Sequence, residues 1–313
     1  FSDMAYRTVD EVLRDADLAM YEAKAGGRGR VAVFDQSMHD KVAQKLALEG
    51  DLRRAIGEGQ LSLLFQPIFD LQHGRRLVGF EALTRWTHPQ RGPVSPAVFI
   101  AIAEESGHIA ALTDWVIEQG GAQLAAWQAA QPPGQRALSL NVNISSRDLD
   151  RASLVPHVCG VVERHRLAPG SLTLEITEST LMGRLEAALP TMRTLRSRGV
   201  RFSIDDFGTG YSSLAYLGTL PIDSLKIDRS FVLGLEQRQQ DREIVRAILR
   251  LGHSLGRKVV AEGVETAQQL AILRELGVDF GQGYLLARPL QPAQLAPLPG
   301  GELPAALRDQ AVA

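Results

Sequence analysis

The stretch "LTLEIT", residues 172–177, alternates as a β-strand does, but it carries a carboxylate in its middle. Side chains on a strand point to opposite faces in turn, so the leucines and the isoleucine share one face and Glu175 lies on the other, between two threonines. An apolar face of this kind packs on a covering helix in α/β proteins. The charged face needs a second explanation, because it lies where a core should form.

Short strand-like runs alternate with helical stretches from residue 61 onwards. The predicted strands cover 61–69, 77–86, 138–144, 172–177, 201–207, 224–228, 258–264 and 281–287, and the predicted helices include 96–106, 112–130, 185–199, 236–255 and 266–276. Eight strands with intervening helices predict a parallel α/β fold, which a TIM-type (β/α)8 barrel of roughly 250 residues matches best. An open doubly wound sheet is the alternative architecture.

The first 57 residues precede this rhythm. Residues 9–25 predict an amphipathic helix, 31–35 a short strand, and 37–57 a charged helix that connects two domains. The chain opens on Phe1 with no initiator Met, so we expect a piece of a longer protein, whose remainder could include a membrane anchor.

Composition excludes several classes of protein. The 313 residues carry a net charge of −2, which argues against a surface for a nucleic-acid polymer or an anionic membrane. A single cysteine, Cys159, excludes an internal disulfide framework and suits the cytosol, so a cytoplasmic location is expected. No apolar run approaches the roughly 20 residues that span a bilayer, so no membrane contact is expected within this piece.

Acidic side chains gather towards the ends of the predicted strands. They are Glu81, Glu175, Asp205, Asp206, Glu262 and Glu265, and the cations that the chain offers them, Lys226 and Arg85, are too few for all of these acids together. Unpaired buried carboxylates are costly, and barrel active sites form where strands end. The sequence therefore predicts bound divalent metal. An all-oxygen ligand set favours Mg²⁺ or Mn²⁺, and the adjacent pair Asp205–Asp206 could serve two ions, a common device in phosphodiester hydrolysis.

The tripeptide EAL, residues 81–83, stands inside GFEALTRW and begins an ordered series of motifs. They continue as NVNIS (141–145), LEITES (174–179), DDFGTGYSSL (205–214), LKIDRSFV (225–232), AEGVE (261–265) and GQGYLLARPL (281–290). The series resembles the EAL-domain cyclic-di-GMP phosphodiesterases over about residues 45–292. The stretch ADLAMYEAKAGGRGRVAVFD (16–35) resembles the C-terminal end of a GGDEF, or diguanylate cyclase, domain, without the GGDEF motif itself.

The resemblance implies a division into a GGDEF remnant (1–36), a connecting helix (37–57), an EAL barrel (45–300) and a tail (301–313). It also implies hydrolysis of cyclic-di-GMP to linear pGpG with two Mg²⁺ or Mn²⁺ ions. The implied metal ligands are Glu81, Asn143, Glu175, Asp205, Asp206 and Glu262, and the implied catalytic residues are Glu81, Lys226 and Glu262. Substrate contacts are implied for Gln66, Leu83, Arg85 and Gln282, and support for Glu178, with the 206–213 loop, and for Glu265.

Two departures from the family pattern are Thr84, often Leu, and Asp148, often Gln. Neither affects an expected acid, and the complete acid set favours an enzyme over a degenerate relative. The alternatives are a cyclic-di-GMP receptor that signals through the 37–57 helix without turnover, and a scaffold that dimerises. The resemblance further implies a homodimer and upstream GGDEF or sensory domains as partners.

Overall fold

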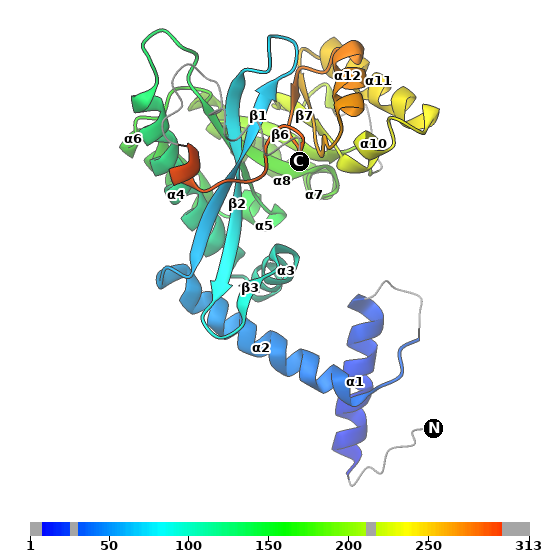
Figure 1. Cartoon of the computed structure of the whole chain (residues 1–313). Coiled ribbons are helices and arrows are strands. Elements are labelled where there is room, and N and C mark those ends of the chain that lie inside the picture. Colours follow the sequence, from blue (N-terminus) through cyan, green and yellow to red (C-terminus); the bar gives the residue numbers. More distant parts are fainter. Residues whose placement is uncertain (1–7, 26–30, 211–216, 296–313) are drawn as a thin grey trace.

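The computed structural model describes residues 8–25, 31–210 and 217–295. Within them, eight strands form a closed ring with helices around it (Figure 1). The strand order is β1-β9-β8-β7-β6-β5-β4-β2, and β2 pairs back to β1. The short β3 pairs with β2 as an extra strand. Because β1 and β2 close the ring, the predicted (β/α)8 barrel is confirmed and the open sheet is excluded.

The strands and helices have the following bounds. The strands are β1 (Leu61–Asp70), β2 (Leu77–His88), β3 (Gly92–Val94), β4 (Ser139–Asn143), β5 (Leu172–Thr177), β6 (Arg201–Phe207), β7 (Ser224–Ile227), β8 (Lys258–Ala261) and β9 (Phe280–Gly281). The longer helices are α1 (Val9–Ala25), α2 (Gln36–Gly57), α3 (Pro96–Ser106), α4 (Ile109–Ala130), α6 (Leu154–Arg164), α8 (Leu185–Ser197), α11 (Gln239–Ser254) and α12 (Ala267–Leu276). Short helices are α5 (Ser146–Asp150), α7 (Glu178–Met182), α10 (Arg229–Leu233) and the 3-10 turn η1 (Pro292–Leu295).

Strand β1 departs from the expected parallel sheet. It pairs antiparallel with both β2 and β9, whereas the ladders joining β2, β4, β5, β6, β7, β8 and β9 are parallel. Residues 71–76 between β1 and β2 are too few for a crossover helix, so the chain returns as a hairpin. In Figure 1 these two strands run on beyond the barrel towards α2 and α3.

Two predicted strands end earlier than expected. The strand over 258–264 stops at Ala261, and the one over 281–287 reaches only Gly281. The chain then turns, because the N–H groups of Leu286 and Ala287 donate to the carbonyl of Gly283. The run GQGYLLA, residues 281–287, therefore predicted a strand where the backbone forms a tight turn.

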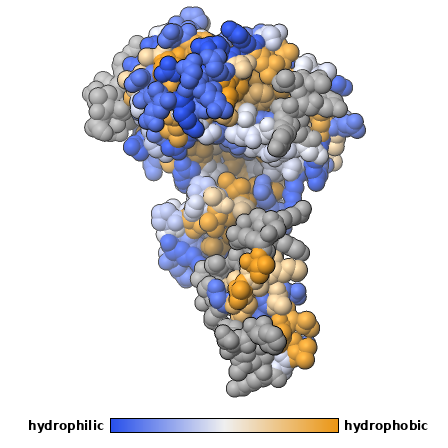
Figure 2. Space-filling view, turned by 90° about the vertical axis from the view of Figure 1, so that its right-hand side faces the viewer, coloured by the Kyte–Doolittle hydropathy of each residue, from blue (hydrophilic) through white to orange (hydrophobic). Residues whose placement is uncertain are grey.

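The N-terminal helices agree with the prediction, but the strand between them does not. Residues 31–35 have no regular structure, and no strand of the described ranges pairs with them. Val31 and Val33 are 92% and 81% exposed. Figure 1 shows α1 apart from the barrel, joined to it through α2, and Figure 2 shows apolar side chains on the lower part of the molecule. The short apolar run alone predicted this strand, and a strand also needs a partner.

The apolar core lies between the barrel wall and its helices. Outward-facing strand residues such as Leu174, Phe202 and Leu225 are fully buried against them. The ring centroids of Phe65 and Phe80 lie 4.8 and 4.3 Å from that of Trp127 on α4. A second cluster joins α2 to α3, α4 and the hairpin. Among the described helices, none has both the length and the apolar character needed to cross a bilayer.

Candidate active site

Lys226 occupies the centre of the barrel and is completely buried. Its Nζ atom contacts carboxylates from four different strands or strand ends. It lies 2.5 Å from Glu262 Oε1, 2.9 Å from Glu175 Oε2, 3.3 Å from Glu81 Oε2 and 3.4 Å from Asp205 Oδ1. The acids that the sequence placed on inward faces therefore meet around one ammonium group, which was expected as one of two available cations.

Strand register explains why these acids meet. Asn143 lies beside Glu175 across the β4–β5 ladder, and Thr177 lies beside Asp205 across the β5–β6 ladder. The amide of Asn143 donates to Glu81 Oε1 at 2.8 Å, and that of Asn141 donates to Glu175 Oε1 at 2.8 Å. Glu81 and Glu175 thus each have an asparagine amide on one carboxylate oxygen and Lys226 on the other.

Burial and crowding divide the acids by protonation. Burial raises the pKa of Glu175 well above its usual range, and the neighbouring carboxylates add to this against the attraction of Lys226. Burial also raises the pKa of Glu262, to about 8. Burial acts on Glu81 in the same direction, but Lys226 and the amides of Gln282 and Asn143 hold its pKa below the usual value. One ammonium thus leaves the pKa values of Glu175 and Glu262 raised.

A second acidic group lies beside this centre. Carboxylate oxygens of Asp205, Asp206 and Glu262 lie within 4.8 Å of one another. Asp206 has a left-handed backbone, with φ of 52°, and its N–H donates to Asp205 Oδ1. Burial raises the pKa of Asp206, and the charges of Asp205 and Asp228 raise it further. The donors are hard oxygen atoms carrying excess negative charge, so the site fits Mg²⁺ or Mn²⁺.

Gln282 links the two acidic groups. Its Nε2 atom donates to Glu81 Oε2 at 2.6 Å and to Glu262 Oε1 at 3.0 Å. Its Oε1 atom is buried and has no hydrogen-bond partner among the described residues. An oxygen left without a donor beside clustered carboxylates is a further feature of a site built for a cation or a donor-rich ligand.

The acids open into a pocket of about 230 Å³ at the barrel mouth. Its lining includes Glu81, Asp205, Glu262, Gln66, Leu83, Gln282 and Glu265 from the expected set, together with Arg229, Gly263, Gly283 and Tyr284. Arg85 was expected to contact substrate but does not line this pocket. Arg85 lies two residues after Leu83 on β2, and its guanidinium donates to the carbonyl of Thr84.

Two supporting acids hold the loops around the mouth. Glu178, almost fully buried, accepts a hydrogen bond from the Gly208 N–H at 2.8 Å. This contact fixes the start of the loop over 206–213, of which residues 211–213 lie outside the described ranges. Glu265 pairs with Arg229 at 2.6 Å, on the wall of the pocket. Both acids thus act on loop position in this structure.

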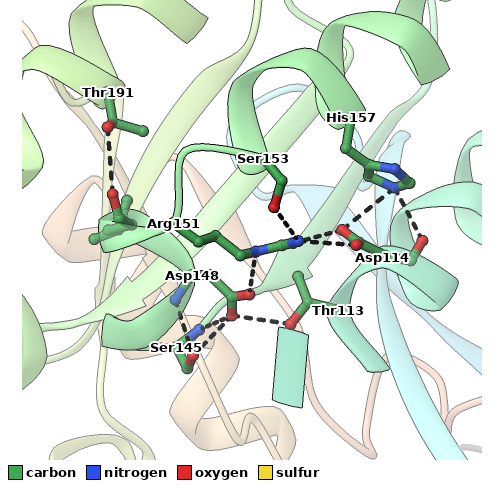
Figure 3. A network of polar contacts seen from close by, with 9 residues as sticks. Thr113, Asp114, Ser145, Asp148, Arg151, Ser153, His157 and Thr191 are labelled. Atoms are coloured by element: carbon green, nitrogen blue, oxygen red, sulfur yellow. Dashed lines mark hydrogen bonds and ion pairs between the residues drawn. The ribbon is translucent and has the colours of Figure 1, made fainter. Parts of the chain in front are cut away.

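A polar network fixes the loop that follows Asn143 (Figure 3). Asp148 is completely buried and accepts from the N–H and Oγ of Ser145, from Thr113 Oγ1 and from Arg151 Nε. The same guanidinium pairs with Asp114 on α4. Asp148 therefore forms an ion pair and a helix cap, so the Asp at this position, where the resemblance implied Gln, has a structural role.

Sequence reasoning missed three residues of the site. Asn141 shares its strand face with Asn143, so alternation could have identified it. Arg229 and Tyr284 follow strand ends, and their roles depend on turns that alternation does not predict. Glu81, Glu175, Asp205 and Lys226 lie together because strand parity and strand ends determine where they lie.

Comparison with known proteins agrees with this geometry. Residues 49–289 match the family model described as the EAL domain. The chain belongs to the EAL domain family. It is 44% identical to the cyclic di-GMP phosphodiesterase NbdA of Pseudomonas aeruginosa. That alignment extends over 286 residues, which are 91% of this chain and 36% of NbdA. It is 42% identical over 289 residues to the bifunctional diguanylate cyclase/cyclic di-GMP phosphodiesterase MucR of the same organism, covering 92% of this chain and 42% of MucR.

The fold has a counterpart among solved structures. The structure titled "PaMucR Phosphodiesterase, c-di-GMP complex" aligns with a TM-score of 0.74 at 42% identity, over 80% of this chain and 99% of that one. The chain spans less than half the length of these two curated relatives, so the activities in their names belong to longer proteins.

Proposed function

We propose that this chain hydrolyses one phosphodiester bond of cyclic di-GMP and releases linear pGpG. The observation that carries the proposal is the buried Lys226 within hydrogen-bonding or ion-pair distance of four carboxylates at the mouth of an EAL barrel. Relatives named cyclic di-GMP phosphodiesterases support the choice of substrate.

Two divalent ions, Mg²⁺ or Mn²⁺, are part of the proposal. The residues that would hold them are Glu81, Asn143, Glu175, Asp205, Asp206 and Glu262, whose oxygen donors surround the mouth. Such ions acidify a bound water and neutralise phosphate charge. The excess of acids over Lys226 supports this assignment, because cations would let all of them ionise.

The chain's own groups would position and stabilise the reacting phosphate. Lys226 keeps its proton, because the surrounding carboxylates hold its pKa well above the usual value despite burial. Its charge would oppose the negative charge that builds on the phosphoryl oxygens as water attacks and the ester bond breaks. Glu262, which lines the pocket and contacts Lys226 Nζ at 2.5 Å, is the candidate acceptor of the water's proton.

The substrate would rest on side chains that line the pocket. Gln66, Leu83 and Gln282 stand there and are proposed contacts. Arg85 is proposed to reach the second, uncleaved phosphate by leaving its contact with Thr84.

We also propose that residues 1–36 belong to the end of a preceding GGDEF domain. Val9, Leu13 and Met20 on α1 are 75%, 59% and 49% exposed, as expected for a helix whose covering domain is elsewhere. The domain division at 37–57, the homodimer, the upstream sensory partners and the cytoplasmic location stay predictions.

Chromatographic product analysis tests the proposed activity. We expect pGpG to form from cyclic di-GMP in Mg²⁺ or Mn²⁺ and not in EDTA. A protein that binds the nucleotide in calorimetry but forms no pGpG with either metal would be a receptor, and the enzymatic proposal would fail. Binding of neither metal nor nucleotide would favour the scaffold.

A further inference from the structure

Asn141 lies inside the barrel, below Asn143 on the same face of β4. The two residues are two positions apart, which separates them by about 7 Å along the strand. Asn141 is 7% exposed and does not line the acidic pocket. Any effect of this buried amide on a ligand in the pocket therefore passes through its neighbours.

Two asparagine amides cross between the strands that carry Glu81 and Glu175. Asn141 lies beside Glu81 across the β2–β4 ladder, but its Nδ2 atom donates to Glu175 Oε1 at 2.8 Å. Asn143 lies beside Glu175 across the β4–β5 ladder, but its Nδ2 atom donates to Glu81 Oε1 at 2.8 Å. Each amide reaches past its ladder neighbour, and together they fix both carboxylates relative to β4.

Glu175 is held at both of its carboxylate oxygens. Oε1 accepts from Asn141, and Oε2 accepts from Lys226 at 2.9 Å. The terminal torsion of a glutamate is broad, so the two contacts fix the plane of the carboxylate. Because Glu175 is completely buried, loss of the Asn141 donor would leave Oε1 without this partner and the carboxylate free to turn.

A neutral amide suits a carboxylate that has to hold a cation. A carboxylate oxygen can accept at two positions, so Oε1 keeps one of them for a metal ion while Asn141 occupies the other. Unlike the ammonium of Lys226, the amide adds no positive charge that would repel this ion. Hydrogen-bonding groups behind metal-binding side chains commonly orient them in this way.

We propose that Asn141 is a positioning residue that orients Glu175 towards the metal ion. This inference rests on the metal binding in the proposed function, and it adds to that site a residue that would contact neither the ion nor the nucleotide. Asn141 therefore acts on the affinity for metal, and the affinity for cyclic di-GMP at saturating metal does not depend on it.

The test measures Mn²⁺ binding by calorimetry, without nucleotide, in the wild type, Asn141→Leu and Thr173→Val. Leucine is close to asparagine in shape and has no N–H group to donate. The matched control is Thr173, the ladder neighbour of Asn141 on β5, which is 6% exposed and has no hydrogen bond to a site acid among the described residues. We expect Asn141→Leu to raise the Kd for Mn²⁺ by about 10-fold to 100-fold, and Thr173→Val to keep the wild-type value.

Turnover of cyclic di-GMP gives a second readout. Asn141→Leu should need a higher Mn²⁺ concentration for half-maximal rate, and its KM for the nucleotide at saturating Mn²⁺ should remain that of the wild type. A loss of packing alone would lower the amount of active protein without moving either midpoint. If Asn141→Leu does not unfold cooperatively, Asn141→Ala takes its place with the same expectation.

An unchanged Kd for Mn²⁺ in the Asn141 variant, or an equal loss in Thr173→Val, would overturn the positioning proposal and leave the phosphodiesterase proposal intact. A wild type that binds Mn²⁺ but forms no pGpG refutes the proposed activity, and the Kd of the Asn141 variant still decides the role of this residue. A wild type that binds neither Mn²⁺ nor Mg²⁺ refutes this proposal together with the metal site of the proposed function.

Discussion

Replacing Lys226 by Met removes the ammonium group at the centre of the acids and keeps a side chain of similar length. Lys226 is fully buried, and its Nζ contacts four carboxylates at 2.5–3.4 Å. Removing one partner of a buried ion pair costs about 3–5 kcal/mol, because the remaining charge is left uncompensated. We therefore expect a loss of this size in the free energy of unfolding, measured in EDTA.

Urea denaturation followed by tryptophan fluorescence measures this loss. The matched control is Lys258→Met, because Lys258 pairs with one carboxylate, Asp279, at 2.6 Å, with 62% of its side chain exposed. Exposed pairs contribute about 0–1 kcal/mol, so the control should lose little. Mg²⁺ should restore part of the stability of Lys226→Met, since cations would take over the neutralisation of the acids.

A Lys226→Met variant as stable in EDTA as Lys258→Met would refute this reasoning. The buried acids would then be compensated by protonation alone, and the excess of negative charge would no longer argue for bound metal.

Two further substitutions test the supporting structure. Asp148→Asn keeps the side-chain shape but removes the charge that accepts four hydrogen bonds, so we expect the free energy of unfolding in urea to fall by about 1–3 kcal/mol. The control is Thr191→Val, at the edge of the same network, which should cost less. An equal cost would contradict the central role of Asp148. Burial acts against the charge of Asp279, but hydrogen bonds from Lys258, His253 and the Val259 N–H hold its pKa below the usual value. A carboxyl group whose pKa is lower in the folded state stabilises the fold at pH values above its unfolded-state pKa, and this stabilisation is lost on acidification. Asp279→Asn should therefore lower the free energy of unfolding by about 1–3 kcal/mol at pH 7. Its difference from the wild type should shrink below about pH 4. A difference that does not change with pH would contradict the assignment.

The barrel and the acidic centre could be predicted because both depend on simple periodicities. Glu175 and Lys226 stand on the polar faces of strands whose other faces are apolar, and parity alone places them inside. Strand direction was not predictable in the same way. The alternation in β1 is the same for a parallel or antiparallel strand, and only the short turn after Asp70 determines that the chain returns as a hairpin.

The remaining errors arise where local pattern and tertiary partner disagree. Val31 and Val33 belong to a short apolar run typical of a strand but have no strand beside them in the described ranges, so no ladder forms. After Gly281, the close approach of Gly283 to Val264 bends the chain into a turn, which hid the position of Tyr284 from a reading based on alternation.

The rate of pGpG formation by Glu81→Ala in Mg²⁺, beside that of the wild type, tests the central claim most directly. The carboxylate of Glu81 accepts hydrogen bonds from Lys226, Asn143 and Gln282, so its removal breaks the contacts that join these residues at the acidic centre. We expect turnover to fall by at least about 10²–10³-fold in a protein that still unfolds cooperatively, because Glu81 would hold a cation whose charge stabilises the transition state. Turnover close to that of the wild type would contradict the account, because the gathered carboxylates would then have no part in the hydrolysis.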